Sequence, residues 1–196
     1  YANGLTLDKL KKQHSQIDRL NEKYKDICIV KGIESDILTN GDLDYDDEIL
    51  KGFDIVIASV HNNFNLSKEE MTERIVKAVS NQYTTILGHP TGRLLLTREA
   101  YNVDLDRVID ACVKHNVIIE INGNPYRLDL DWRYVKKAKQ MGGKFVISPD
   151  AHRIKDLDNN KYGINIARKG WLSAKDVINT KELKELIDYK NIKARD

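Results

Sequence analysis

The stretch Asp54-Ile-Val-Ile-Ala-Ser-Val-His61 is a short run of mainly apolar, β-branched residues that ends at a histidine. A run of this length, rich in Val and Ile, is typical of a buried β-strand. Four further stretches have the same character, and each also gives way to polar residues. Together they predict five buried strands, at residues 27–33, 54–60, 84–87, 117–121 and 144–147.

Longer amphipathic stretches separate these runs and predict helices. The first covers residues 5–24 with Thr6 as its N-cap, and the second opens at Ser67 with a capping-box pattern. Two more cover residues 104–114 and 131–141, and two weaker ones lie near residues 173–178 and 181–189. Strands that alternate with helices predict an α/β fold with a mainly parallel sheet and outer helices, in one domain over residues 1–196.

The composition excludes several classes of protein. Hydrophobic residues make up 41% of the 196 residues and charged residues 32%, which is typical of a globular domain and not of a disordered chain. The net charge of +2 gives no sign of a broad basic field for nucleic acid, and no apolar run is long enough for a membrane span. Cys28 and Cys112 are interpreted as free core thiols, which favours a cytoplasmic protein.

The polar residues after each strand are spaced by about one βαβ step. Glu34, His61 and His89 follow one another at intervals of 27 and 28 residues, and Asp150 and His152 follow the fifth strand. Because the carboxyl ends of parallel strands meet at one rim, these side chains are expected to converge there. Imidazoles mixed with carboxylates suit Zn²⁺, Mn²⁺ or Fe²⁺, so the pattern predicts a divalent-metal site.

Other residues near these strand ends are candidates for holding substrate. Arg93 and Arg127 could each grip a phosphate through a bidentate fork, with a salt bridge to a carboxylate as the alternative, and Asn124 lies in the same loop as Arg127. Trp171 favours packing over base stacking. His14 and His115 are interpreted as structural, His14 on a polar helix face and His115 at a helix end.

Several segments together resemble the PHP (polymerase and histidinol phosphatase) family, and most closely the C-terminal PHP domain of bacterial X-family DNA polymerases. The segments are GIESDI, ASVHNNF, LGHPTGR, EINGNPYRLDL and SPDAHR. The resemblance implies a distorted (β/α)7 barrel with a trinuclear metal site that hydrolyses phosphoesters by metal-activated water. In that subgroup it further implies a Mn²⁺-dependent 3′–5′ exonuclease that processes DNA ends in repair.

The resemblance also assigns roles to individual residues. Glu34 matches a bridging carboxylate, His61 and His89 match two histidines that share a metal with it, and the pair Asp150 and His152 matches ligands of the other two metals. The first two strands of the family, with their HxH and Asp-His ligands, do not occur in this sequence. We therefore expect an incomplete barrel that is a fragment of a longer polymerase chain, binds at most one Mn²⁺ or Zn²⁺ well, and is weak or inactive alone.

Two alternatives to a DNA 3′-end hydrolase stay open on the sequence. One is a phosphomonoesterase of the histidinol-phosphatase type, and the other is a structural or interaction domain that supports a polymerase. The expected partners are DNA and the upstream polymerase domains in the full-length protein, with no membrane. An unclosed sheet edge also favours homodimerisation of the fragment.

Overall fold

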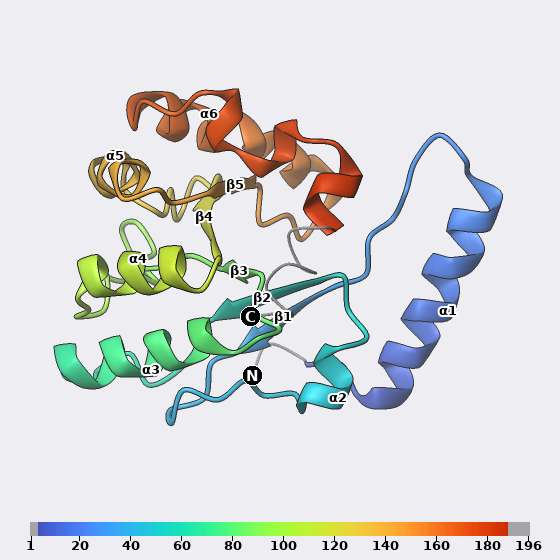
Figure 1. Ribbon diagram of the computed structural model, residues 1–196, viewed down its shortest axis with the longest axis horizontal. Coiled ribbons are helices and arrows are strands. Elements are labelled where there is room, and N and C mark those ends of the chain that lie inside the picture. Colours follow the sequence, from blue (N-terminus) through green and yellow to red (C-terminus); the bar gives the residue numbers. More distant parts are fainter. Residues whose placement is uncertain (1–3, 188–196) are drawn as a thin grey trace.

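The computed structural model describes residues 4–187 and contains one open sheet of five parallel strands (Figure 1). The spatial order follows the sequence, so each strand pairs with its neighbours along the chain. This confirms the α/β prediction, and the arrangement is consistent with part of a PHP-type barrel. The strands are β1 Gly32–Asp36, β2 Ile55–Ser59, β3 Ile86–Leu87, β4 Ile118–Asn122 and β5 Phe145–Ser148.

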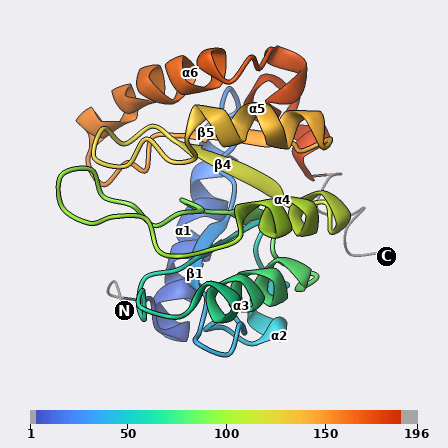
Figure 2. The ribbon, with the colours of Figure 1, turned by 90° about the vertical axis from the view of Figure 1, so that its left-hand side faces the viewer.

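Six α-helices and three short 3-10 helices have both ends within residues 4–187, and residues 183–187 are helical as well. Helices α3 to α6 follow one another along one side of the molecule, as Figures 1 and 2 both show. The α-helices are α1 Leu7–Lys23, α2 Asp47–Leu50, α3 Lys68–Ser80, α4 Leu105–Lys114, α5 Trp132–Gln140 and α6 Asn160–Lys169. The 3-10 helices are η1 Ile154–Asn159, η2 Ala174–Asp176 and η3 Ile178–Thr180.

The helix starts lie where the capping residues predict them. The Thr6 side chain accepts a hydrogen bond from the Lys9 N–H, and Ser67 and Glu70 form the reciprocal bonds of a capping box. Asp104 and Asp131 cap α4 and α5 in the same way. These local bonds satisfy N–H groups that have no partner inside the helix.

The core lies around the sheet, and β4 is its most deeply buried strand, with all five residues buried. Apolar side chains of α3 and α4 pack there, because their buried stripes repeat at helical spacing. The largest fully buried side chains include Phe53, Met71, Ile75, Ile109, Ile119 and Phe145. This packing fixes the strands, and with them the polar residues at their carboxyl ends.

Several local predictions are wrong. The first strand begins at Gly32 and not at residue 27, because the Asn21 side chain binds both the N–H and the C=O of Ile29. The 173–178 helix is replaced by the 3-10 helices η2 and η3. Residues 183–187 are helical, but the last two residues of the predicted 181–189 helix lie outside the described residues. Cys112 is buried as expected, whereas Cys28 is exposed and does not belong to the core.

Helix α1 stands apart from α3–α6, beyond β1 (Figure 1). Of its predicted apolar stripe only Leu10 is buried, while Leu20 and Tyr24 are 40% and 47% exposed. His14 is half-buried and packs edge-on against Phe53, with 4.9 Å between ring centroids. None of the helices described in residues 4–187 is long and apolar enough to cross a membrane.

Candidate metal centre

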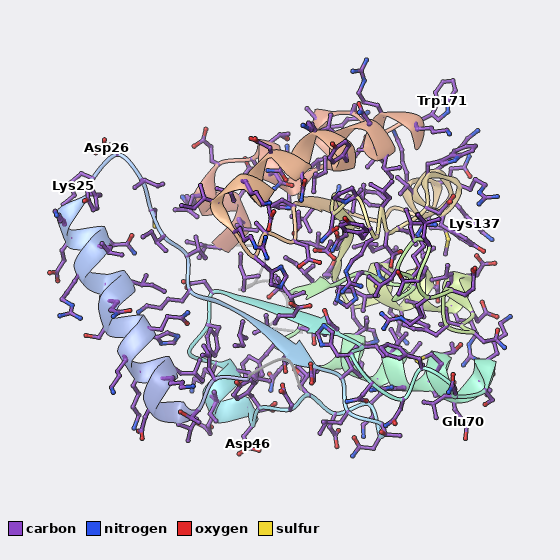
Figure 3. All side chains as sticks on the ribbon, turned by 180° about the vertical axis from the view of Figure 1, so that it is seen from behind. Lys25, Asp26, Asp46, Glu70, Lys137 and Trp171 are labelled. Carbon is purple, nitrogen blue, oxygen red and sulfur yellow. The ribbon has the colours of Figure 1, made fainter. Side chains whose placement is uncertain are left out.

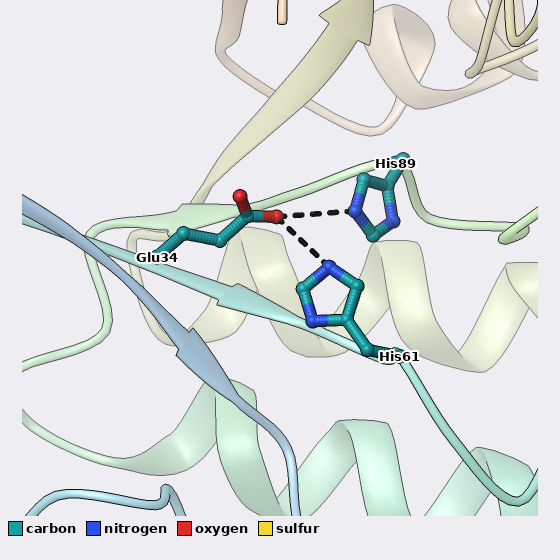
Figure 4. A group of neighbouring side chains, drawn as sticks. All are labelled: Glu34, His61 and His89. Carbon is teal, nitrogen blue, oxygen red and sulfur yellow. Dashed lines mark hydrogen bonds and ion pairs between the residues drawn. The ribbon is translucent and has the colours of Figure 1, made fainter. Parts of the chain in front are cut away.

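Three predicted ligands meet at the carboxyl ends of the first three strands. Glu34 lies in β1, and His61 and His89 each lie two residues beyond the end of their strand. Oε1 of Glu34 is 3.2 Å from Nε2 of His61 and 3.1 Å from Nε2 of His89 (Figure 4). Because the strands are parallel neighbours, the regular spacing in sequence becomes convergence in space.

The cluster is closed on one side and open on the other. The His89 side chain is only 3% exposed, whereas those of His61 and Glu34 are 19% and 39% exposed. The two imidazole rings meet edge to face, with centroids 5.1 Å apart. A small ligand can therefore approach the three Nε2 and Oε1 atoms from the Glu34 side.

His61 is oriented by a second carboxylate. Its Nδ1 lies 2.5 Å from Oδ1 of Asp36, at the end of the same strand that carries Glu34. When the ring is neutral and donates its Nδ1–H to a carboxylate, it presents the lone pair of Nε2, which is the form a metal requires. Asp36 thus sets both the tautomer and the direction of the His61 ring.

The electrostatics of the cluster favour a cation. Burial alone raises the pKa of the Glu34 carboxyl, but hydrogen bonds from His61 and His89 outweigh it and hold that pKa far below its usual range. Burial lowers the pKa of His61, but bonds to Glu34 and Asp36 outweigh it and raise that pKa above its ordinary value. The Glu34 carboxylate therefore stays ionised, and it stabilises positive charge at this point.

The turn that carries His89 is fixed by its backbone. His89 has a φ of 25°, and its N–H donates to Oε2 of Glu120 over 2.6 Å. A Cβ at the preceding Gly88 would collide with the side chain of Ser59, so glycine is required at this close approach. Glu120 is itself buried, which raises its pKa. The buried carboxylate therefore holds the backbone of a ligand residue.

The donor set fits a divalent transition metal. The candidate ligand atoms of Glu34, His61 and His89 all lie within 4.8 Å of one another, and they are the only such group among the described residues. Two imidazole nitrogens and one carboxylate oxygen suit Zn²⁺ or Mn²⁺ better than Ca²⁺ or Mg²⁺, which favour oxygen ligands. Three protein ligands also leave a coordination position open, as in catalytic metal sites.

Asp150 and His152 lie outside this group. Oδ2 of Asp150 accepts hydrogen bonds from Nε of Arg127 and Nδ2 of Asn122, both over 3.1 Å. The His152 side chain is 78% exposed, and its Nδ1 lies 3.0 Å from the carbonyl oxygen of Asp150. The structure thus brings three of the five predicted ligands together, and ligation by the other two stays a prediction.

The three residues predicted to hold substrate are engaged within the protein. The guanidinium of Arg93 donates to the carbonyl oxygens of Arg127 and Leu128 and pairs with Asp131. Arg127 pairs with Asp150, and Oδ1 of Asn124 accepts the N–H of Tyr126 within its own turn. These contacts are those of the salt-bridge alternative, and a substrate role stays a prediction.

Sequence reasoning did not assign roles to the residues that support the ligands, chiefly Asp36 and Glu120. For Asp36 a signal was present, because residues 34 and 36 of one strand point to the same face. Glu120 lies in an otherwise apolar run, and an acidic residue at such a position is itself a functional signal. The sequence does not reveal that Asp36 contacts His61 or that Glu120 contacts His89.

This chain is similar to curated proteins that are named as an exonuclease or as probable phosphatases, although no protein-family model matches it. It is 45% identical over 185 residues to the DNA polymerase/3′-5′ exonuclease PolX of Bacillus subtilis (strain 168), covering 94% of this chain and 32% of that protein. It is 32% identical over 186 residues to a probable phosphatase of Thermoanaerobacter sp. (strain X514), covering 89% of this chain and 74% of the relative. A probable phosphatase of Clostridium acetobutylicum is 27% identical over 188 residues. The chain spans about a third of the length of the PolX relative.

Proposed function

The chain belongs to the family that includes these probable phosphatases and PolX, and from that premise we propose that it is a metal-dependent phosphoesterase module. More specifically, we infer that it is a PHP-type domain of a bacterial X-family DNA polymerase that hydrolyses phosphodiester bonds at DNA 3′ ends. The observation that carries the proposal is the convergence of Glu34, His61 and His89 at one half-open point of the sheet rim.

Each side chain has a role that follows from its contacts. His61 and His89 would hold the ion through Nε2 and Glu34 through Oε1, while Asp36 keeps the His61 ring in the required tautomer. A divalent ion bound there supplies a Lewis acid for a phosphoester oxygen and lowers the pKa of water. Glu120 holds the backbone of His89, and the exposed side of Glu34 leaves room for the phosphate.

The proposed stoichiometry is one well-bound Mn²⁺ or Zn²⁺ per chain. Only one group of three metal-ligating residues is formed within residues 4–187. Asp150 is bound to Arg127 and Asn122, and His152 extends into solvent, so neither offers a second complete set of ligands. With one such group in the described residues, we expect slow turnover by this chain alone.

A diester at a DNA end is the proposed substrate, and a small phosphomonoester is the second candidate. The 45% identity to a protein named as a 3′-5′ exonuclease favours the diester, while relatives named as probable phosphatases favour the monoester. A different class of function is also proposed, in which this domain is not an enzyme and supports the polymerase domains as a structural or interaction partner. It predicts a metal site without turnover.

Cleavage under single-turnover conditions tests these proposals. The chain, in excess of substrate, is incubated with Mn²⁺ or Zn²⁺ and with either 5′-labelled DNA or p-nitrophenyl phosphate. We expect shortening of the DNA from its 3′ end, and at least a hundredfold loss in His61→Ala and His89→Ala. His115→Gln, at the end of α4 and outside the cluster, is the matched control. Metal bound at the cluster without hydrolysis of either substrate would refute the catalytic proposal.

Self-association is a separate proposal, supported by the exposed apolar positions of α1. Leu7, Leu20 and Tyr24 are 51%, 40% and 47% exposed, and α1 lies beside the outer strand β1 (Figure 1). A second copy of the chain could cover these side chains. Sedimentation of the chain and of Leu20→Glu decides it: a dimer that the variant dissociates supports the proposal, and a monomer at all concentrations contradicts it.

A further inference from the structure

Helices α5 and α6 form a basic pole that the overall composition hides. They carry seven lysines and arginines and no Asp or Glu, although the whole chain has a net charge of only +2. The remainder of the chain therefore has a net charge of −5, from +2 minus +7. The two helices lie side by side in Figures 1 and 2. The seven residues are Arg133, Lys136, Lys137, Lys139, Lys161, Arg168 and Lys169.

Trp171, just beyond the end of α6, is exposed and conformationally strained. Its side chain is 71% exposed, and its φ of 64° lies in the left-handed region. The Leu172 N–H bonds to the Ala167 carbonyl, which closes the helix in the way that normally uses glycine at the Trp171 position. A tryptophan at this position is strained, and its ring gains little burial in return. The packing role favoured from sequence therefore does not explain it.

Lysines surround this ring and a second tryptophan. The Lys136 ammonium lies 5.5 Å from the centroid of the Trp171 ring, and Nζ of Lys139 donates to the Trp171 carbonyl. The Lys169 ammonium lies 4.9 Å from the centroid of the Trp132 ring. A shallow hollow of about 290 Å³ is lined by Lys136, Lys139, Gln140 and Trp171. Figure 3 shows Trp171 projecting from the edge of the molecule.

Part of this positive charge has no carboxylate partner within the described residues. Lys137 pairs with Asp106 and Lys139 with Asp176. Within residues 4–187, by contrast, Lys136, Arg168 and Lys169 form no salt bridge with Asp or Glu. Cations that have no carboxylate partner within residues 4–187 and lie beside an exposed aromatic ring favour an anionic ligand that also has flat, stackable groups.

We propose that the α5–α6 basic face, made of Lys136, Lys139, Arg168, Lys169, Trp132 and Trp171, binds single-stranded nucleic acid. Bases stack on the Trp171 ring, and the phosphates lie along the lysines and Arg168. This combination of a basic surface with an exposed aromatic ring is the one that single strands need, because a duplex keeps its base faces stacked internally. The face contains none of the proposed metal ligands, so binding here does not depend on hydrolysis.

Fluorescence anisotropy of a labelled oligothymidylate, without added metal, tests the face directly. We expect Trp171→Gly to weaken binding about tenfold, since loss of one stacked base has an effect of that order. Glycine also removes the left-handed strain, so loss of binding in this variant does not reflect misfolding. Lys136→Glu combined with Arg168→Glu is expected to weaken binding at least tenfold and to flatten the salt dependence by about 0.7 per lost phosphate contact.

The control reverses the charge of two exposed lysines on α1, as Lys9→Glu combined with Lys12→Glu. It changes the net charge by the same amount as Lys136→Glu combined with Arg168→Glu. We expect it to alter the affinity by less than about threefold at 0.1 M salt, because the change lies beyond screening distance. Equal loss in the control and in the α5–α6 variant would refute the proposal. Full binding by Trp171→Gly would also refute it. Binding of poly-glutamate and duplex DNA as tight as that of the single strand would refute it as well.

Discussion

Nδ1 of His61 lies 2.5 Å from Oδ1 of Asp36, while Nε2 of the same ring lies 3.2 Å from Oε1 of Glu34. One imidazole thus joins two carboxylates that are two residues apart on β1. The more buried carboxylate, Asp36, orients the ring, and the more exposed one, Glu34, contributes a ligand atom to the candidate metal position. Because residues 34 and 36 share one face of β1, the strand places both carboxylates against the ring that is proposed to bind the metal.

Removing the charge of Asp36 should weaken metal binding without removing a ligand. We expect Asp36→Asn to lower the affinity for Mn²⁺ or Zn²⁺ by 10- to 100-fold, because a neutral amide holds the His61 tautomer less firmly. Isothermal titration calorimetry measures the effect. Asp46→Asn, an exposed carboxylate whose side chain makes no capping bond, is the control. Equal affinities for wild type and Asp36→Asn would contradict the proposed role.

Arg74 ties together the two loops that follow β1 and β2. Its buried guanidinium donates to the carbonyl oxygens of Ile37, Leu38 and Asn62. We expect Arg74→Met to lower the free energy of unfolding by about 3 kcal/mol, because several buried acceptors lose their donor. Urea denaturation measures this. Lys77→Met, on the exposed side of the same helix, should change it by about 0.5 kcal/mol or less, and equal effects would exclude a special role for Arg74.

Asp129 should make stability fall as pH rises. It is fully buried and accepts the Thr91 N–H, and burial raises its pKa. The folded chain therefore keeps this proton to a higher pH than the unfolded chain, whose value is near 3.8. From about pH 4 up through the raised pKa, this residue progressively destabilises the folded state relative to Asp129→Asn.

Urea unfolding of wild type and Asp129→Asn between pH 4.5 and 7.5 measures this trend. The difference in unfolding free energy should shift steadily in favour of the variant. Asp131→Asn is the control, because hydrogen bonding to Arg133 lowers the pKa of Asp131 to about 2. The stability that Asp131 contributes is lost only as pH falls below about 4, so its difference should stay constant. A constant difference for Asp129→Asn would contradict the prediction.

Backbone strain at Trp171 should be measurable as stability. We expect Trp171→Gly to be more stable than Trp171→Ala by about 1 kcal/mol, because alanine keeps the left-handed penalty and glycine does not. Thermal and urea unfolding of the pair report the difference while both lack the ring. Two variants of equal stability would show that the φ of 64° carries no strain.

The parts of the fold that could be predicted from sequence are those set by local pattern. The recurrence of Glu34, His61 and His89 at successive strands follows from βαβ spacing, and the helix starts follow from capping residues such as Ser67. These features depend on residues close together in the chain. The three ligands that meet are 27 and 28 residues apart in sequence, and they come together because β1, β2 and β3 are neighbours in the sheet.

What could not be predicted depends on distant contacts. Helix α6 does not stand out in the sequence because Gly163 weakens its helical pattern, and the structure shows that a side chain there would press into Ile147. The position of Asp150 depends on Asn122 at the end of β4 and on Arg127 in the loop after it, and both donate hydrogen bonds to its carboxylate. Such partners are distant in sequence, so a short stretch of sequence does not reveal them.

The most direct test of the central claim is the number of metal ions bound per chain. Equilibrium dialysis against Mn²⁺ or Zn²⁺, followed by elemental analysis, should give one tightly bound ion in the wild type. That ion should be lost in Glu34→Ala, His61→Ala and His89→Ala, and kept in His152→Ala, whose side chain lies outside the cluster. Three tightly bound ions, or one ion that survives loss of His61 or His89, would contradict the account.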